Sequence, residues 1–90
     1  MNTKRTSFKA YVYRLIAAGR IRDAIRELID WVNHKNNNQD LLHRILIVSG
    51  MFEMLESVAN MQLLPYFEYR MGIARHLKQI LELLEEATAE

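Results

Sequence analysis

Apolar residues recur at helical spacing along almost the whole of this 90-residue chain. Between residues 8 and 16 they fall at positions i, i+3, i+4, i+7 and i+8, which is one face of an α-helix. Only three glycines and one proline interrupt the chain, which favours long elements with few turns. Since no stretch carries a strand signal, the sequence predicts an all-α fold.

The stretch LIAAGRIRDAIREL places a glycine between two helical stripes. Thr6 or Ser7 can cap the start of the first helix, and Gly19 suits a left-handed residue at its end. A second stripe runs from residue 21 to residue 32, with Asp23 in its first turn, where the helix dipole favours a negative charge. We therefore expect two short helices with a corner at Gly19. One continuous helix with a costly internal glycine is the alternative.

A longer third helix is expected after the loop HKNNNQD, in which the asparagines favour turns. Asn38 or Asp40 can cap this helix. Apolar residues cover more than one of its sides, so we expect it to occupy a central position. The small pair Ser49 and Gly50 in its middle predicts either a close approach of another helix backbone or a bend.

Pro65 predicts the end of the third helix and the start of a fourth, because proline disfavours a helical residue before it and suits the first helical turn. The fourth helix is expected over about 66–87. Short connections favour antiparallel neighbours. The sequence therefore predicts a four-helix antiparallel bundle, with two short helices followed by two long ones. We expect a single domain over 1–90 with its core at about 8–86.

Composition limits the function classes. The chain has no cysteine, which excludes disulfides, thiol catalysis and zinc–thiolate sites and fits a reducing cytoplasm. It has no apolar run of about 18 residues, so no membrane span is expected. No apolar signal core follows the basic start MNTKRTSF, so export by that route is not expected. We therefore predict a cytoplasmic protein without a membrane partner.

No residue pattern indicates catalysis or a cofactor. A metal site in a helical bundle would need two Glu-x-x-His sets and further inward carboxylates, which the chain lacks. Its three histidines, His34, His43 and His76, are expected to be exposed or to cap helices. Ser49 has no histidine or acid in a recognisable triad order, and the isolated glycines form no phosphate loop. We therefore expect no enzyme activity, no cofactor and no metal.

Charge is distributed unevenly, although the net charge is only +1. Residues 1–26 hold seven basic residues and one acidic residue, a net charge of +6. Residues 53–90 hold three basic residues and seven acidic residues, a net charge of −4. The two ends can neutralise each other if they lie side by side, or they can meet those of a second copy head to tail. Scattered surface ion pairs are the plainest interpretation.

The chain contains Gly19-Arg20-Ile21 with Ala24, Val48-Ser49-Gly50 with Phe52, and Ile80-Leu81-Glu82-Leu83-Leu84. These segments resemble the bacterial effector-associated domains, specifically the eleventh type. In that family a Gly-Arg corner precedes a helix centred on alanine, a long helix contains a Ser-Gly core, and the last helix ends in Leu-Leu-Glu-Leu-Leu. The resemblance covers about residues 8–86.

The chain departs from the family pattern at three places. Met51 follows Ser-Gly where the family usually has arginine, and Pro65 replaces a serine cap. In the last helix the family usually has an asparagine and an arginine around an isoleucine, where this chain reads Ala74-Arg75-His76. The resemblance implies a death-like adaptor that brings effectors such as proteases or nucleotidases to a sensor in bacterial immune-type systems, by association with its own kind.

The expected partner is another helical domain of the same family or a second copy of the chain, in a homo-oligomer. Charged residues on the second helix would meet acidic residues on the fourth helix of a neighbour, and a large aromatic residue at the edge of its stripe can mark an interface. A small nucleic-acid-binding bundle is the alternative, disfavoured by the acidic last helix; a plain dimerising regulatory bundle is another. The residues expected to bind the partner are Arg20, Arg22, Arg26, Trp31, Glu82, Glu85 and Glu86.

Overall fold

The computed structural model of the protein describes residues 3–89, and all its regular elements are helical. The expected all-α architecture of two short helices followed by two long ones is confirmed. The elements, in chain order, are α1 (Thr3–Ala17), α2 (Ile21–Trp31), a π-helical turn η1 (Val32–Asn36), α3 (Gln39–Asn60) and α4 (Tyr66–Ala87).

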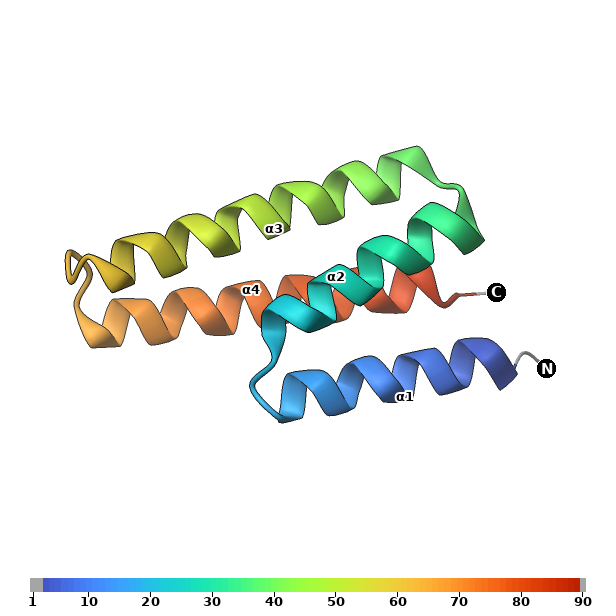
Figure 1. Cartoon of the computed structure of the whole chain (residues 1–90), viewed down its shortest axis with the longest axis horizontal. Coiled ribbons are helices and arrows are strands. Elements are labelled where there is room, and N and C mark those ends of the chain that lie inside the picture. The colour runs from blue at the N-terminus through green and yellow to red at the C-terminus, as the bar shows by residue number, and fades with distance from the viewer. Residues whose placement is uncertain (1–2, 90) are drawn as a thin grey trace.

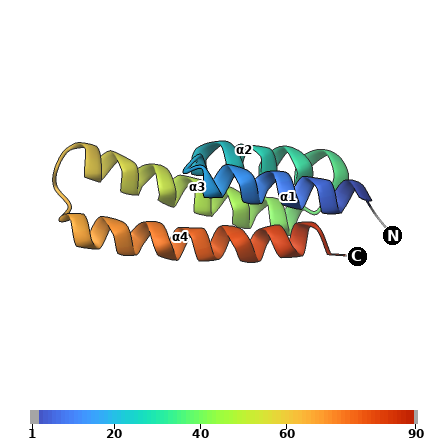
Figure 2. The ribbon, with the colours of Figure 1, turned by 90° about the horizontal axis from the view of Figure 1, so that it is seen from below.

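The two long helices α3 and α4 form an antiparallel hairpin, and the short helices cover only part of it (Figure 1). Helix α2 contacts both α3 and α4, while α1 packs against α2. The turn between α3 and α4 projects beyond α1 and α2, as both views show (Figure 2). The two ends of the chain lie together at the opposite end of the hairpin (Figure 1).

The core lies where α2 sits against the hairpin. Each helix contributes one buried stripe, as the 3.6-residue periodicity predicts. The buried apolar residues are Val12 and Leu15 of α1; Ala24, Ile25 and Leu28 of α2; Val32; Leu41, Ile45, Val48 and Phe52 of α3; and Ile80, Leu83, Leu84 and Ala87 of α4.

Gly19 ends α1 in the left-handed conformation that the sequence predicts, with φ +76°. The Arg20 amide donates to the carbonyl of Leu15 at 2.8 Å, and the Gly19 amide donates to that of Ile16 at 3.0 Å. This pair of hydrogen bonds is the Schellman arrangement, which satisfies carbonyls left free at a helix end. The corner between two helices is therefore confirmed.

The start of α1 differs from the expectation. Helix α1 begins at Thr3, so the predicted caps Thr6 and Ser7 lie inside it, and that prediction is wrong. Two features favour the longer helix. The intervening lysine and arginine are good helix formers. In addition, the Arg5 guanidinium donates to the Ala89 carbonyl at 3.0 Å, which ties the first turn to the end of the chain.

The expected loop after α2 is shorter than the sequence indicated, because its first residues continue as the π-helical turn η1. Asn37 follows with φ +52°, a left-handed conformation that asparagine tolerates. The Asn38 side chain accepts a hydrogen bond from the Leu41 amide at 3.1 Å. Of the two candidate caps for α3, Asn38 is therefore the residue used.

The glycine in the middle of α3 does not admit a neighbouring helix of this chain. A Cβ atom at Gly50 would meet no atom of the described residues within 4 Å, so the first of the two expectations, a close approach of another helix, is wrong at Gly50. The close approach is at Gly72 of α4, where a Cβ would lie 2.9 Å from Leu55 Cδ2 of α3. Gly72 thus lets the two long helices pack closely near their connecting turn.

Gln62 closes α3 with the same hydrogen-bond pattern as Gly19, but it has a side chain. Its φ is +59°, and the Leu63 and Gln62 amides donate to the carbonyls of Val58 and Ala59 at 3.2 and 3.0 Å. A left-handed conformation costs a residue with a Cβ about 1–2 kcal/mol. This turn therefore carries strain that a glycine would relieve.

We expect Gln62→Gly to raise the free energy of unfolding by about 0.5–1 kcal/mol. The strain energy removed from the folded state exceeds the free energy by which the added backbone entropy of glycine stabilises the unfolded chain. Urea denaturation followed by far-UV circular dichroism measures the change. Gly19→Ala is the matched control and should lower the stability, because it creates the same strain at φ +76°. A change of the same sign in both variants would contradict this account.

Candidate interaction surfaces

The predicted basic residues of α2 are largely engaged within the chain. Arg22 donates from Nε and Nη2 to the Glu53 carboxylate of α3, at 2.7 and 2.8 Å. Arg20 donates from Nε to Asp23 at 2.8 Å. Arg26 is the least constrained, with Nη1 3.8 Å from Asp23 and 68% of its side chain exposed. The structure thus places Arg22 and Arg26 on α2 and Arg20 directly before its first residue, and it gives each an acidic neighbour.

The predicted acidic residues of α4 separate into paired and unpaired positions. Glu85 accepts from Lys9 Nζ at 2.8 Å and from the Tyr13 hydroxyl at 2.9 Å, both on α1. Glu86 accepts from Nη1 and Nη2 of Arg44 on α3, at 2.8 and 2.7 Å. Glu82 is exposed and has no ion-pair partner within residues 4–89. The basic start and acidic end of the chain therefore neutralise each other in part.

Trp31 ties three helices together. Its ring stacks on Phe8 of α1, with centroids 4.2 Å apart and planes inclined by 10°. Its indole N–H donates to the Ala87 carbonyl at the end of α4, at 3.1 Å. The side chain is half-buried at the edge of the core. The structure therefore gives this predicted interface residue an internal packing role.

Hydrogen bonds from basic side chains lower the pKa of three surface carboxyls. Arg22 lowers the pKa of Glu53, and Arg44 lowers that of Glu86. The pKa of Glu85 is lowered by Lys9 first and then by the Tyr13 hydroxyl. Each group therefore binds its proton more weakly in the folded chain than in the unfolded one.

We expect the protein to lose stability as the pH falls below about 4.5, the ordinary pKa of these carboxyls. A lowered folded-state pKa contributes stability above the unfolded value and loses it as the pH falls through the folded value. Melting temperatures across a pH series measure the effect. Glu86→Gln should be less stable than the parent at neutral pH and should lose less on acidification. If the melting temperature of Glu86→Gln fell on acidification as much as that of the parent, the stabilising pair between Arg44 and Glu86 would be contradicted.

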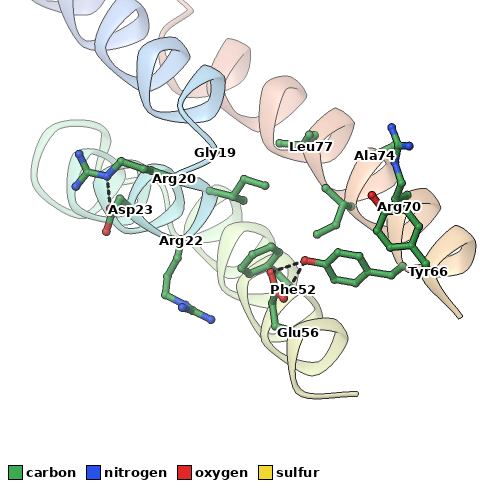
Figure 3. Close-up of a pocket in the computed structure, with 13 residues that line it drawn as sticks. Gly19, Arg20, Arg22, Asp23, Phe52, Glu56, Tyr66, Arg70, Ala74 and Leu77 are labelled. Atoms are coloured by element: carbon green, nitrogen blue, oxygen red, sulfur yellow. Dashed lines mark hydrogen bonds and ion pairs between the residues drawn. The ribbon is translucent and has the colours of Figure 1, made fainter. Parts of the chain in front are cut away.

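A groove with a volume of about 580 Å³ lies between the α1–α2 corner and the projecting half of the hairpin (Figure 3). Tyr69 donates its hydroxyl to Glu56 at 3.0 Å, and the Arg70 guanidinium lies 5.8 Å from the centre of the Tyr66 ring. The apolar spacing of the last helix, with Ile73 and Leu77, predicts that either Tyr69 or Tyr66 continues its buried stripe. However, α1 and α2 do not extend over this part of α4, and Tyr66 is 73% exposed.

A second groove, which we call the outer groove, runs along α3 and α4 on another side of the hairpin. It contains two hollows of about 250 and 310 Å³, lined by residues of α3, α4 and the turn between them. Met51 lines both hollows. Met51 and Glu53, which binds Arg22 of α2, lie about 200° apart around α3, so the outer groove is turned away from the contact between α2 and α3. The residues of the outer groove are Arg44, Ile47, Val48, Met51, Met54, Leu55, Val58, Leu64, His76, Gln79, Glu82, Leu83 and Glu86.

The histidines are separated in the fold. His34 Nδ1 lies 2.8 Å from the carbonyl of Asp30, and His43 is exposed. His76 is 6% exposed, with Nδ1 3.2 Å from Gln79 Oε1, so the expectation of an exposed or capping role is wrong there. It falls on the buried stripe of α4, four residues before Ile80. No group of three potential metal ligands occurs in the described part of the chain.

Comparison with known families identifies the domain. The family model of effector-associated domain 11 matches residues 7–88. The chain belongs to the effector-associated domain 11 family. Searches of curated proteins and of solved structures gave no significant match. Membership indicates an adaptor-type domain of effector proteins. Across the described residues of this effector-associated domain, no helix is both long and apolar enough to cross a membrane.

Proposed function

We propose that this effector-associated domain is a non-enzymatic, death-like adaptor that recruits or assembles effectors in a bacterial immune-type signalling system. It would do so by binding another helical domain of its own family or a second copy of itself. Membership in the family supports the adaptor role. The exposed apolar surface of the α3–α4 hairpin supports association with a protein partner.

This exposed apolar surface is the observation that carries the proposal. Eleven large apolar side chains are exposed in the described chain, and nine of them belong to α3, α4 and their turn. Leu63, Phe67 and Met54 are 70%, 71% and 69% exposed. Large apolar groups gathered on one part of a protein mark interaction sites, whereas single scattered ones need no explanation. The hairpin is therefore the best candidate for partner contact.

The charged residues predicted from the sequence fit a second type of contact. The α2 face with Arg20, Arg22 and Arg26 would meet the α4 face with Glu82, Glu85 and Glu86 in a neighbour. The internal ion pairs lie at the surface and can be exchanged for intermolecular ones. Such a contact joins different patches, so it can propagate as an open chain.

Molar mass from light scattering tests the adaptor proposal, measured over a range of protein concentrations at low and high salt. The chain should be measured alone and mixed with another effector-associated domain 11. We expect a mass above that of the monomer in at least one of these samples. A strict monomer that binds no domain of the family would overturn the proposal.

Charge reversal separates the two types of contact. Arg26→Glu is the cleanest change, since Arg26 makes only a long ion pair and its loss leaves the Arg22–Glu53 pair intact. Assembly through the charged faces should weaken in this variant and in high salt. Assembly through the apolar hairpin should persist in both.

A further inference from the structure

The outer groove carries a surface that is complementary to itself. We propose that it binds the outer groove of a second copy in an antiparallel dimer with two-fold symmetry. The inference rests on the proposed association of the domain with its own kind, and it specifies the surface and the geometry. Helix α3 would lie on α3 of the second copy, and α4 on α4.

The apolar part of this surface is a stripe on α3. Ile47, Met51 and Met54 are 62%, 43% and 69% exposed and follow one another at four- and three-residue spacing, so they share one side of the helix. Val58 continues the stripe and lines the same groove. Burial of these side chains against a second copy removes apolar area from water on both partners.

The charged part lies on α4, where Glu82 lines the outer groove and Arg75 lies just beyond the lining residues, one turn before Gln79 on the same side of the helix. Arg75 and Glu82 are both exposed, and neither has an ion-pair partner within residues 4–89. They are seven residues apart, two helical turns, and therefore lie on the same side of α4, about 10 Å from each other. This contrasts with Glu85 and Glu86, whose charges are satisfied within the chain.

The apolar stripe of α3 and the charged pair of α4 are centred at the same level along the hairpin. The midpoint between Ile47 and Met54 falls beside Met51, and the midpoint between Arg75 and Glu82 falls beside Gln79. Met51 and Gln79 line the same hollow of the outer groove. A two-fold axis that crosses both helices at this level would place Ile47 against Met54 of the second copy and Arg75 against its Glu82. The symmetry then forms each contact twice, with opposite charges facing each other.

Gly50 gives an independent reason for this geometry. It lies at the centre of α3 next to Met51 and is exposed, and a Cβ there would meet nothing within 4 Å. A glycine inside a helix costs about 1 kcal/mol relative to alanine. No contact within the described chain explains this cost. At the crossing of two α3 helices, the missing side chain would let the backbones approach closely.

Charge exchange between two positions tests the register. Sedimentation equilibrium gives the dimer dissociation constant Kd for Arg75→Glu, for Glu82→Arg and for the double variant. We expect each single variant to raise Kd about tenfold or more, because like charges then face each other twice. The double variant should restore Kd to near the parent value. Arg14→Glu on α1 is the control and should leave Kd unchanged. Failure of the double variant to restore dimers would overturn the proposed register.

A single cysteine provides a second readout, since the chain has none of its own. Met51→Cys lies at the proposed axis and should form a covalent dimer with a short bis-maleimide. Met71→Cys is 50% exposed in the parent and lies about two turns of α4 from the proposed axis, so the two substituted side chains would be too far apart for the same short cross-linker. Equal cross-linking would overturn the dimer. Binding of another effector-associated domain 11 by a chain that stays monomeric would overturn the dimer but keep the adaptor role, whereas absence of both would overturn the adaptor role too.

Discussion

Replacing Leu28 with alanine is expected to lower the free energy of unfolding by about 3–4 kcal/mol. Leu28 is 0% exposed and lies where α2 meets the long hairpin. Truncation of a buried leucine loses its transfer free energy and leaves a cavity, which together cost about 2–5 kcal/mol. Because small domains are stable by only about 5–15 kcal/mol, much of the stability of this one depends on that contact.

Urea denaturation of Leu28→Ala, followed by far-UV circular dichroism, measures this loss. Leu46→Ala on α3 is the matched control, because the same atoms are removed from a side chain that is 47% exposed. It should cost less than about 1 kcal/mol. A loss as large as that of Leu28→Ala would contradict the dominant contribution of the contact between α2 and the hairpin.

Replacing Trp31 with alanine is expected to lower the free energy of unfolding by about 2–3 kcal/mol. The change removes a ring that stacks on Phe8 and a hydrogen bond to the Ala87 carbonyl, so it loosens α1 and the end of α4 together. Full truncation of a buried tryptophan costs about 3–5 kcal/mol, and Trp31 is half-buried.

Trp31→Phe separates the two contributions. It keeps an aromatic ring for the stack and removes only the indole N–H, so we expect a smaller loss of about 1 kcal/mol. Unfolding should be followed by circular dichroism, because the chain has no second tryptophan for fluorescence. Unchanged stability of Trp31→Ala with lost self-association would instead assign this residue to a partner interface.

The helices were predictable because their signals are local. Gly19 ends α1 since glycine adopts positive φ readily, and α4 begins at Tyr66, directly after Pro65, for the same steric reasons that the sequence suggested. The spacing of apolar residues also identified most of the core. These features depend on neighbours a few residues away, which the sequence displays directly.

The composition of the surfaces was less predictable, because it depends on contacts between residues that are far apart in the sequence. Lys9 and Glu85 are 76 positions apart, and only the packed fold brings them together. The same limit applies to Tyr66, which belongs to an apolar stripe but is exposed because the short helices do not reach it. The roles of Arg20, Arg22, Arg26, Trp31, Glu82, Glu85 and Glu86 in binding a partner stay predictions.

The position of the chain ends sets how this domain can present itself when joined to other modules. Arg5 reaches the Ala89 carbonyl, so both ends leave the particle side by side, at the end opposite the α3–α4 turn (Figure 1). A module fused to either end would be tethered at one pole of a particle about 46 Å long. The α3–α4 turn, at the other end of the domain, would stay accessible to a partner whichever chain end carries the fused module.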